Sequence, residues 1–180
     1  MSSDAKRVPK AKRQLSDAML ALLRERSFQR IGVNDLCEHA LISRATFYTH
    51  FEDKYDLLRY ALTQIRRQLR EIAQSGQHDV VDLLVSFVYD NADLFRNLLM
   101  RESNPELVRM LSELFITDIA RMIEQSSPET PVVPPMVQAT FVSGGLSHLM
   151  VWWIDSGFSV SREEMAGYLR GLGQAAKKSC

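Results

Sequence analysis

The sequence predicts an all-α protein, and three observations support this fold class. Apolar residues recur three and four positions apart through most of the 180 residues, which is the spacing of one helix face. Turn-forming segments, at Gly76 and in the proline-rich stretch 126–135, separate these patterns. The chain has no convincing alternation of apolar and polar residues of the kind that marks a strand. We therefore expect helices joined by short loops.

The N-terminal part predicts a tail and a first helix. Residues 1–9 are polar and basic and include Pro9, so we expect a disordered tail. A helix follows at 10–26, where four residues form an apolar stripe: Leu15, Met19, Leu22 and Leu23. This helix has one face to bury against the segments that follow.

Two short helices come next. The first begins near Val33, and its apolar residues share a face: Val33, Leu36, Cys37 and Ala40. Leu41 and Ile42 form the turn. Ser43 is a good N-cap for the second helix, because its hydroxyl can accept a free backbone N–H two or three residues further on.

The second short helix, 44–51, has an aromatic face and a polar face. Phe47 and Phe51 lie four positions apart and point inward. Its outward and flanking residues are Arg44, Thr46, Tyr48, Thr49 and His50. Two short helices with a tight turn and a polar outer face are typical of a helix-turn-helix that reads DNA with its second helix.

A long helix is expected at 53–74, with Asp53 as its cap and Lys54 in its first turn. A helix N-terminus with a lysine is a potential phosphate site. Its apolar stripe is Leu57, Leu58, Ala61, Ile65, Leu69 and Ile72. We expect the early turns to pack on the helix-turn-helix and the later turns on the rest of the chain. Its arginines, Arg66, Arg67 and Arg70, are expected on a solvated face.

Five further helices are predicted at 79–90, 91–101, 105–125, 135–156 and 162–177. The sequence Ser161-Arg-Glu-Glu164 is a capping box that fixes the start of the last one. Residues 130–154 contain no charged side chain, but their prolines and polar residues and a short apolar run argue against a membrane span. A helix that is apolar all round is more often buried on two sides, against its own domain and a partner.

The helix-turn-helix segment resembles a known family. The run 40–51, Ala-Leu-Ile-Ser-Arg-Ala-Thr-Phe-Tyr-Thr-His-Phe, followed by Lys54 and Leu57-Leu58, is similar to the DNA-binding domain of the tetracycline-repressor (TetR/AcrR) family. The family pattern is A-G-V-S-x-x-T-hydrophobic-Y-x-H-F-x-x-K-x-x-L. The resemblance covers residues 10–60, and the remainder matches only in length and helical character. Leu41 replaces the usual turn glycine, and Gly32 replaces the usual Thr or Ser cap.

The resemblance implies a set of DNA-binding residues: Asn34, Arg44, Ala45, Thr46, Tyr48, Thr49, His50 and Lys54. Phosphates, which set the register, would be contacted by Thr46, Tyr48 and Lys54, and base edges by Arg44, Ala45 and Thr49. Arg44 could pair with a guanine edge, and the Ala45 methyl could touch thymine. The alternative is a plain polar helix face. The basic tail suits either a flanking minor groove or free solvation.

The second half predicts a ligand pocket and a dimer interface. Aromatic and polar residues on separate helices suggest a pocket for a small, largely apolar effector: Phe87, Phe115, Phe141, His148 and Trp152. The alternatives are a solid core and a hydrogen-bonded core histidine. The last two helices predict a homodimer interface, in which two helices from each subunit form a four-helix bundle. The residues expected there are Gly144, Gly145, Met165, Leu169 and Leu172.

Composition limits the possible functions. Residues 1–70 carry a net charge of +6 and residues 71–180 a net of −6, as in a basic DNA-binding part on an acidic body. The two cysteines, Cys37 and Cys180, form no metal or disulfide pattern, which fits the reducing cytoplasm. The histidines form no ligand cluster, and no nucleophile, phosphate loop or dinucleotide motif is present, so we expect neither metal, cofactor nor enzyme activity.

The sequence therefore predicts two parts, a helix-turn-helix DNA-binding domain at 10–52 and a helical ligand-binding and dimerisation domain at 53–180. We expect a homodimeric transcriptional regulator, most simply a repressor, that binds a palindromic double-stranded operator and is released by a small molecule. The alternative is a TetR-like coactivator that binds a protein partner instead of operator DNA.

Overall fold

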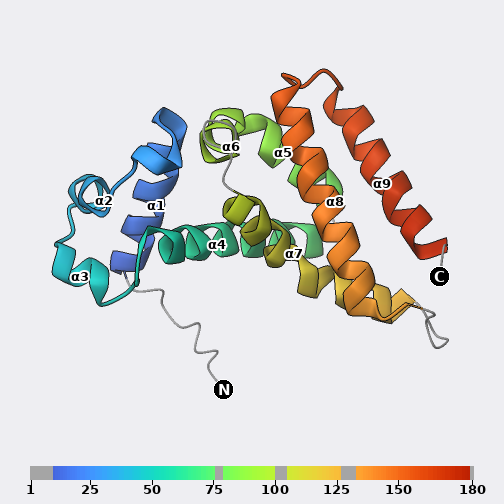
Figure 1. Ribbon diagram of the computed structural model, residues 1–180, viewed down its shortest axis with the longest axis horizontal. Coiled ribbons are helices and arrows are strands. Elements are labelled where there is room, and N and C mark those ends of the chain that lie inside the picture. The colour runs from blue at the N-terminus through green and yellow to red at the C-terminus, as the bar shows by residue number, and fades with distance from the viewer. Residues whose placement is uncertain (1–9, 76–78, 100–104, 127–132, 179–180) are drawn as a thin grey trace.

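The computed structural model describes residues 10–75, 79–99, 105–126 and 133–178, and within these ranges the chain is helical without strands, as predicted (Figure 1). The expected tail at 1–9 and residues 127–132 of the proline-rich loop lie outside the described residues. Three helices form a head at one end: α1 (Lys10–Glu25), α2 (Val33–Ala40) and α3 (Arg44–Tyr48).

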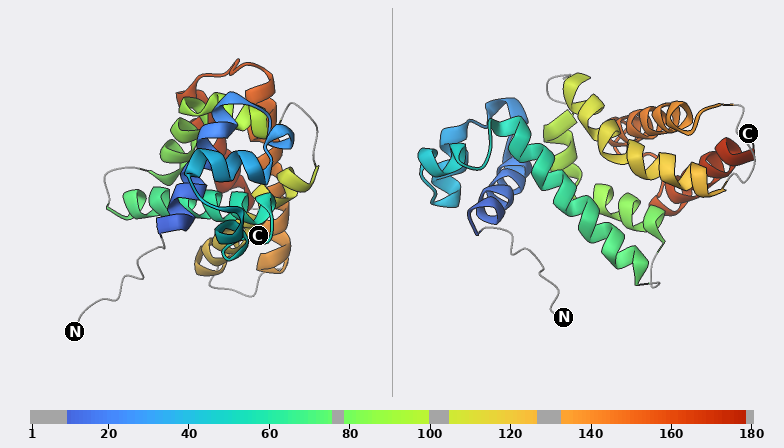
Figure 2. Two further views of the ribbon diagram at one scale, coloured as in Figure 1. Left: turned by 90° about the vertical axis from the view of Figure 1, so that its left-hand side faces the viewer. Right: turned by 90° about the horizontal axis from the view of Figure 1, so that it is seen from below.

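A single long helix connects the head to the body of the molecule. Figure 2 shows α4 (Lys54–Gln74) running from the head along the underside of the body. The body consists of α5 (Val80–Asp90), α6 (Ala92–Leu99), α7 (Pro105–Ser126), α8 (Pro135–Asp155) and α9 (Arg162–Lys178). These helices correspond to the predicted ones within a few residues at each end. None of the described helices is both long and apolar enough to cross a membrane.

The head and the start of α4 share one apolar core. Its most deeply buried side chains come from four helices and the α1–α2 loop: Leu15, Met19, Leu23, Phe28, Ile31, Leu36, Phe47, Leu57 and Leu58. Burying each of these large side chains stabilises the fold by about 1.5–3 kcal/mol. The predicted apolar stripes of 10–26 and of the early turns of α4 are therefore confirmed.

A second connection joins the head to the body through α6, which packs on α1. The buried amide of Asn97 donates to the carbonyl of Leu23 at 3.0 Å, near the C-terminal end of α1. Arg24 donates to Asn91 at 2.9 Å on the exposed side of the same contact. The head is thus joined to the body both through α4 and through the contact of α6 with the C-terminal end of α1.

Inside the body, α7 packs along α8 and α5 packs on α9. Trp153 is fully buried, donates its indole N–H to Val160 at 2.8 Å and meets the edge of Phe158 at 4.9 Å. The predicted capping box is confirmed, because Ser161 and Glu164 exchange hydrogen bonds of 3.0 and 3.2 Å. These bonds to Ser161 hold the pKa of Glu164 below its usual value.

Two local features differ from the prediction. A 3-10 turn, η1 (Phe28–Arg30), follows α1 and had no signal in the apolar pattern. Arg66 is not on a solvated face, because its guanidinium bonds the Leu114 carbonyl on α7 and ties α4 to the body. Arg67 is exposed and pairs only loosely with Glu71 at 3.7 Å, as expected for a solvated face.

Candidate nucleic-acid interface

The start of α3 is fixed by its cap. Ser43 has an extended backbone, and its hydroxyl accepts the Thr46 backbone N–H at 3.1 Å, as predicted. Phe47 and Phe51 are buried and anchor the inner face of the segment in the head. The helix ends at Tyr48, earlier than expected, and the Thr49 hydroxyl that follows donates to the carbonyls of Ala45 and Thr46. The outer face is therefore a single short turn of helix held rigidly from below.

Arg44 is the central cation of this face and is already oriented. Its guanidinium bonds the Asn34 side-chain oxygen on α2 and the Tyr48 hydroxyl at 3.4 Å, and it lies 5.7 Å from the Tyr48 ring centroid. All three side chains are exposed. Sequence spacing places Tyr48 one turn from Arg44, but the contact with Asn34 depends on how α2 and α3 cross. An arginine held in this way loses little side-chain freedom when it meets a ligand.

The remaining predicted residues of α3 differ in exposure. Ala45 and Thr49 are exposed, whereas Thr46 and His50 are half-buried. The Thr46 hydroxyl lies 2.9 Å from that of Ser43. Because the Thr49 hydroxyl proton is committed to the helix backbone, this residue can only accept from a ligand. The structure therefore brings seven of the eight predicted residues onto or beside one surface.

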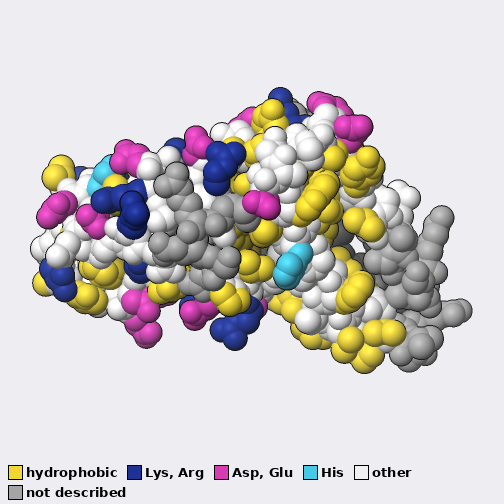
Figure 3. All heavy atoms as spheres, turned by 45° about the horizontal axis from the view of Figure 1, so that its top comes forward, with side chains coloured by type: hydrophobic (Ala, Val, Ile, Leu, Met, Phe, Trp, Pro, Cys, Tyr) yellow, Lys and Arg dark blue, Asp and Glu magenta, His cyan; other side chains and the backbone are white. Residues whose placement is uncertain are grey.

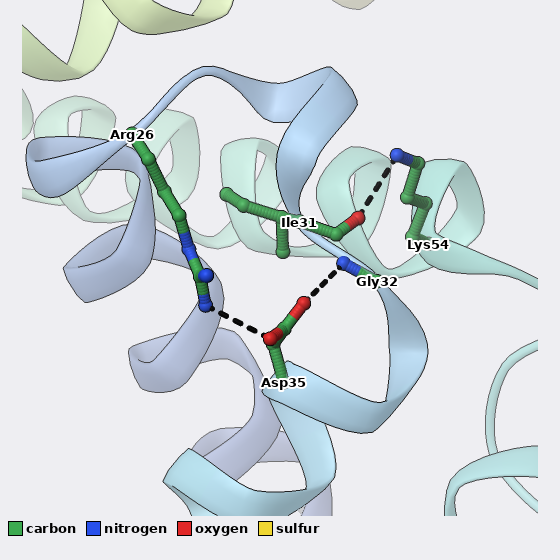
Figure 4. A network of polar contacts seen from close by, with 5 residues as sticks. All are labelled: Arg26, Ile31, Gly32, Asp35 and Lys54. Carbon is green, nitrogen blue, oxygen red and sulfur yellow. Dashed lines mark hydrogen bonds and ion pairs between the residues drawn. The ribbon is translucent and has the colours of Figure 1, made fainter.

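Lys54 is the exception. It was expected to present its ammonium to phosphate at the start of α4, but the side chain is half-buried and turned toward the head. Its Nζ donates to the carbonyls of Phe28, Gln29 and Ile31 at 3.0, 3.3 and 2.9 Å. The structure thus gives this cation three internal acceptors. Figure 4 shows it directed at the Ile31 carbonyl.

The loop between α1 and α2 is held from its other side by an acidic residue. Asp35 accepts the Gly32 backbone N–H at 2.7 Å and pairs with Arg26 at 3.1 Å (Figure 4). The bond from Gly32, followed by the charge of Arg26, holds the pKa of Asp35 below its usual value. Gly32 has no side chain to cap α2, so Asp35 ties the backbone at this helix start instead.

A shallow depression of about 570 Å³ lies at the turn between α2 and α3. Asn34 and Arg44 line it, together with Glu38 and Leu41, which sequence reasoning did not include in the site. Glu38 lies four residues after Asn34, and this helical spacing is the signal that would have placed it on the same face. Cys37 lies at the depression, and burial raises the pKa of its thiol. The thiol is therefore protonated, as expected for a small buried hydrophobe.

Leu41 adopts an unusual backbone conformation. Its φ of 55° and ψ of 43° are left-handed, and its side chain is 91% exposed. This is the position where the family pattern has glycine, the residue that adopts a left-handed conformation most readily. Leucine pays a steric penalty here that glycine does not.

The predicted aromatic pocket is wrong for three of its five residues. Phe141 is 84% and Trp152 49% exposed, and His148 is also exposed, because all three lie on the outer face of α8. His148 bonds the Gly144 carbonyl one turn earlier in its own helix at 2.9 Å. Phe87 stacks edge-on against Phe95 at 5.9 Å, and Phe115 is half-buried on α7. The tryptophan that faces the core is the neighbouring Trp153, which is fully buried.

The predicted dimer residues divide into two groups. Met165 and Leu169 are buried within the subunit against α5, so their assignment to an interface is wrong. Leu172 is 56% exposed, and a Cβ added at Gly144 or Gly145 would meet no atom within 4 Å. These three positions remain available to a partner.

The described residues contain no group of three or more His, Cys, Asp or Glu side chains arranged to hold a metal ion. The chemistry that this face offers is hydrogen bonding and positive charge.

Two protein-family models match the chain. The model described as bacterial regulatory proteins of the tetR family matches residues 15–61, which cover most of the head and the first turns of α4. The model described as a transcriptional regulator C-terminal region matches residues 77–174, which cover the body.

Individual relatives agree with these matches. An uncharacterized HTH-type transcriptional regulator of Haemophilus influenzae is 31% identical over 126 residues, which cover 64% of this chain and 58% of the relative. The uncharacterized regulator YxbF of Bacillus subtilis is 24% identical over 102 residues, covering 51% of this chain and 27% of the relative. The chain therefore spans less than two thirds of either relative. A TetR transcriptional regulator from Streptococcus agalactiae 2603V has the same fold, with a TM-score of 0.62 and 20% identity over 91% of this chain and 93% of that one.

The strained turn generates a prediction. Replacing Leu41 by glycine should stabilise the protein by about 1 kcal/mol. The left-handed conformation costs leucine roughly 1–2 kcal/mol, and the greater freedom of glycine in the unfolded chain offsets part of the gain. Urea unfolding monitored by circular dichroism measures the change. Leu41→Ala is the matched control, since it removes the exposed side chain but keeps the Cβ. Equal stabilities of the glycine and alanine variants would show that the backbone conformation carries no penalty.

Proposed function

The chain belongs to the TetR family of bacterial transcriptional regulators, and on this premise we propose that it is a homodimeric repressor, which binds a palindromic operator and is released by a small effector. The observation that carries the proposal is the outer face of α3, where Arg44 is held between Asn34 and Tyr48. A helix that presents a pre-oriented arginine together with small and hydroxyl side chains suits the major groove.

These contacts suggest which residues would meet bases and which would meet phosphates. Arg44 presents a planar set of donors that matches the acceptor edge of guanine, while the exposed Ala45 methyl and Thr49 oxygen can meet neighbouring bases. Tyr48 and Thr46 lie at the flank, where the phosphate backbone passes. Phosphate contacts supply sequence-independent affinity, and the base contacts supply preference.

Self-association is proposed through the outer face of α8 and α9. Among the described residues of these helices, the exposed large apolar side chains are Met136, Val137, Phe141, Trp152, Tyr168 and Leu172. Those on α8 repeat at helical spacing on the face that also holds Gly144, Gly145 and His148. Figure 3 shows hydrophobic side chains gathered over the half of the molecule that contains α8. The occupant that we propose is a second copy of the chain, because an isologous contact lets the same stripe cover itself and sets two heads on one palindrome.

Effector release is proposed to act at the junction of head and α4. A groove of about 170 Å³ lies between α1 and α4, lined by Ser16 and Asp17 on one side and by Tyr60, Gln64 and Arg67 on the other. A molecule bound there would change the angle between the two helices. Leu20, Ala61 and Ile65 also line the groove, so we propose a small effector with a largely apolar body and a polar group that meets the charged side chains.

DNA recognition is tested by two substitutions on α3. Arg44→Ala should relax base preference at one position of each half-site, with a loss of about 1–3 kcal/mol of discrimination. Thr46→Val, which removes the other flanking hydroxyl and leaves the contacts of Arg44 intact, should weaken binding to all duplexes to a similar extent and leave the preferred sequence unchanged. The measurement is selection from random duplexes, followed by fluorescence anisotropy. Arg109→Ala removes an exposed arginine on α7 and is the matched control; it should change neither the selected sequence nor the affinity for DNA.

Selection of the same sequence by Arg44→Ala and by the parent protein would contradict the assigned base contact. A parent protein that binds no duplex would contradict the proposed function and favour the coactivator alternative.

The proposed dimer interface is tested by placing a bulky side chain at Gly145. Gly145→Leu should leave the subunit folded, since the added side chain has open space within its own subunit. It should separate the two copies, because overpacking a close contact costs about 1–3 kcal/mol. Phe141→Asp should do so more strongly. Sedimentation equilibrium at micromolar concentration measures the change, and Ile72→Asp, a half-exposed position on α4, is the control. A monomeric parent protein would refute the proposed interface.

The effector proposal has a thermodynamic test. A ligand that weakens operator binding by about 5- to 150-fold must itself bind more weakly by the same factor when operator is present. Compounds that raise the unfolding temperature are first identified, and their affinities are then measured by calorimetry with and without operator. Gln64→Trp, which fills the groove, should abolish binding of such a compound. Unchanged affinity in the presence of operator would exclude release by this route.

A further inference from the structure

We propose that Lys54 is a positioning residue for DNA recognition, whose ammonium fixes the start of α4 against the α1–α2 loop and so sets the angle at which α3 is presented. The proposal rests on the DNA-binding function proposed above and deepens it. It gives this lysine an internal role in place of the phosphate contact that its position at a helix start suggests.

The ammonium group has a well-defined set of partners. It donates to the carbonyls of Phe28, Gln29 and Ile31 at 3.0, 3.3 and 2.9 Å. It also lies 4.5 Å from the centroid of the Phe28 ring, whose edge is packed by Tyr55, the next residue along α4. Lysine has three rotatable donors on a compact group, and three converging carbonyls match this geometry.

The carbonyls converge because the loop forms a 3-10 turn. The backbone N–H groups of Arg30 and Ile31 donate to Ser27 and Phe28 at 3.0 and 3.1 Å. This leaves the carbonyl end of the turn facing α4. Carbonyl oxygens at the end of a helical turn carry partial negative charge, which a cation stabilises.

The location of Lys54 on α4 supports the same conclusion. As the first residue of the helix, it stands at the positive end of the helix dipole, where a cation is disfavoured. Asp53 caps this end by accepting the N–H groups of Tyr55 and Asp56 at 2.8 Å each. The internal carbonyls and the neighbouring carboxylate offset the unfavourable position. A phosphate contact by the same ammonium would require these internal bonds to be exchanged.

The short connection between α3 and α4 links the position of Lys54 to DNA recognition. Only residues 49–53 join α3 to α4, so the placement of α4 against the head governs where α3 lies. The clamped loop is also bound to α2, through Asp35, Gly32 and Arg26. Lys54 on one side and Asp35 on the other therefore hold the loop between the helix that carries the body and the helices that meet DNA (Figure 4).

The experiment compares the parent protein with Lys54→Met, which keeps the apolar stem, and Lys54→Arg, which keeps the charge. The affinity of each protein is measured for two duplexes, the sequence selected by the parent and a random sequence, at salt concentrations between about 50 and 200 mM. Both variants should bind the selected duplex roughly tenfold more weakly, because recognition depends on close positioning by supporting groups. The random duplex and the salt dependence should be unchanged. Amide exchange at Arg30 and Ile31 should accelerate in both variants without DNA.

A phosphate contact predicts the opposite pattern. Lys54→Met would then weaken both duplexes alike and reduce the slope of log affinity against log salt by about 0.9, while Lys54→Arg would bind normally. That result overturns the proposal, and so does parent-like binding of the selected duplex by Lys54→Met. If Lys54→Met does not fold, Lys54→Arg alone separates the two roles. If the parent binds no DNA, the proposed function fails, whereas the amide exchange still decides whether the ammonium holds the loop.

Discussion

The short segment between α1 and α2 is the constraint on which the head depends. It contains a 3-10 turn rather than a continuous helix, so its carbonyls need partners outside the segment. Lys54 supplies a cation from α4, and Asp35 on α2 pairs with Arg26, the residue that directly follows α1. Phe28 and Ile31 from the same segment are buried in the core. One loop therefore fixes the relative placement of three helices.

This arrangement explains how so small a head can present a rigid surface. α3 is a single turn of helix and could not be stable alone, because short helices are marginal without tertiary packing. Phe47 and Phe51 anchor it from below, and Ser43 satisfies its first free amide. The strained Leu41 at the preceding turn is tolerated because the surrounding core determines the chain path.

The helices of the body differ in which of their faces are covered. Its inner faces are closed by Trp153, Met165 and Leu169, whereas α8 keeps an apolar stripe on its outside. Such a helix is apolar on nearly all sides, as the absence of charge between residues 136 and 154 indicates. Two connections to the head, α4 through Arg66 and α6 through Asn97, link this body to the DNA-facing surface.

The sequence by itself determined the helical fold, the order and approximate bounds of its α-helices, and the motif of the head, because helix periodicity, caps and turn residues are local signals. It also placed Arg44, Tyr48 and Thr49 correctly on the exposed side of the second short helix, whereas Thr46 and His50, expected on the same side, are half-buried. Tertiary structure alone decided which side of an apolar helix is covered. Trp152 and Trp153 are equally apolar neighbours, so no pattern distinguishes them until α5 and α9 are packed, and for the same reason Phe141 was misplaced into a pocket and Met165 into an interface. The partners of Lys54 and Arg66 likewise depend on how distant segments cross, which no local spacing records.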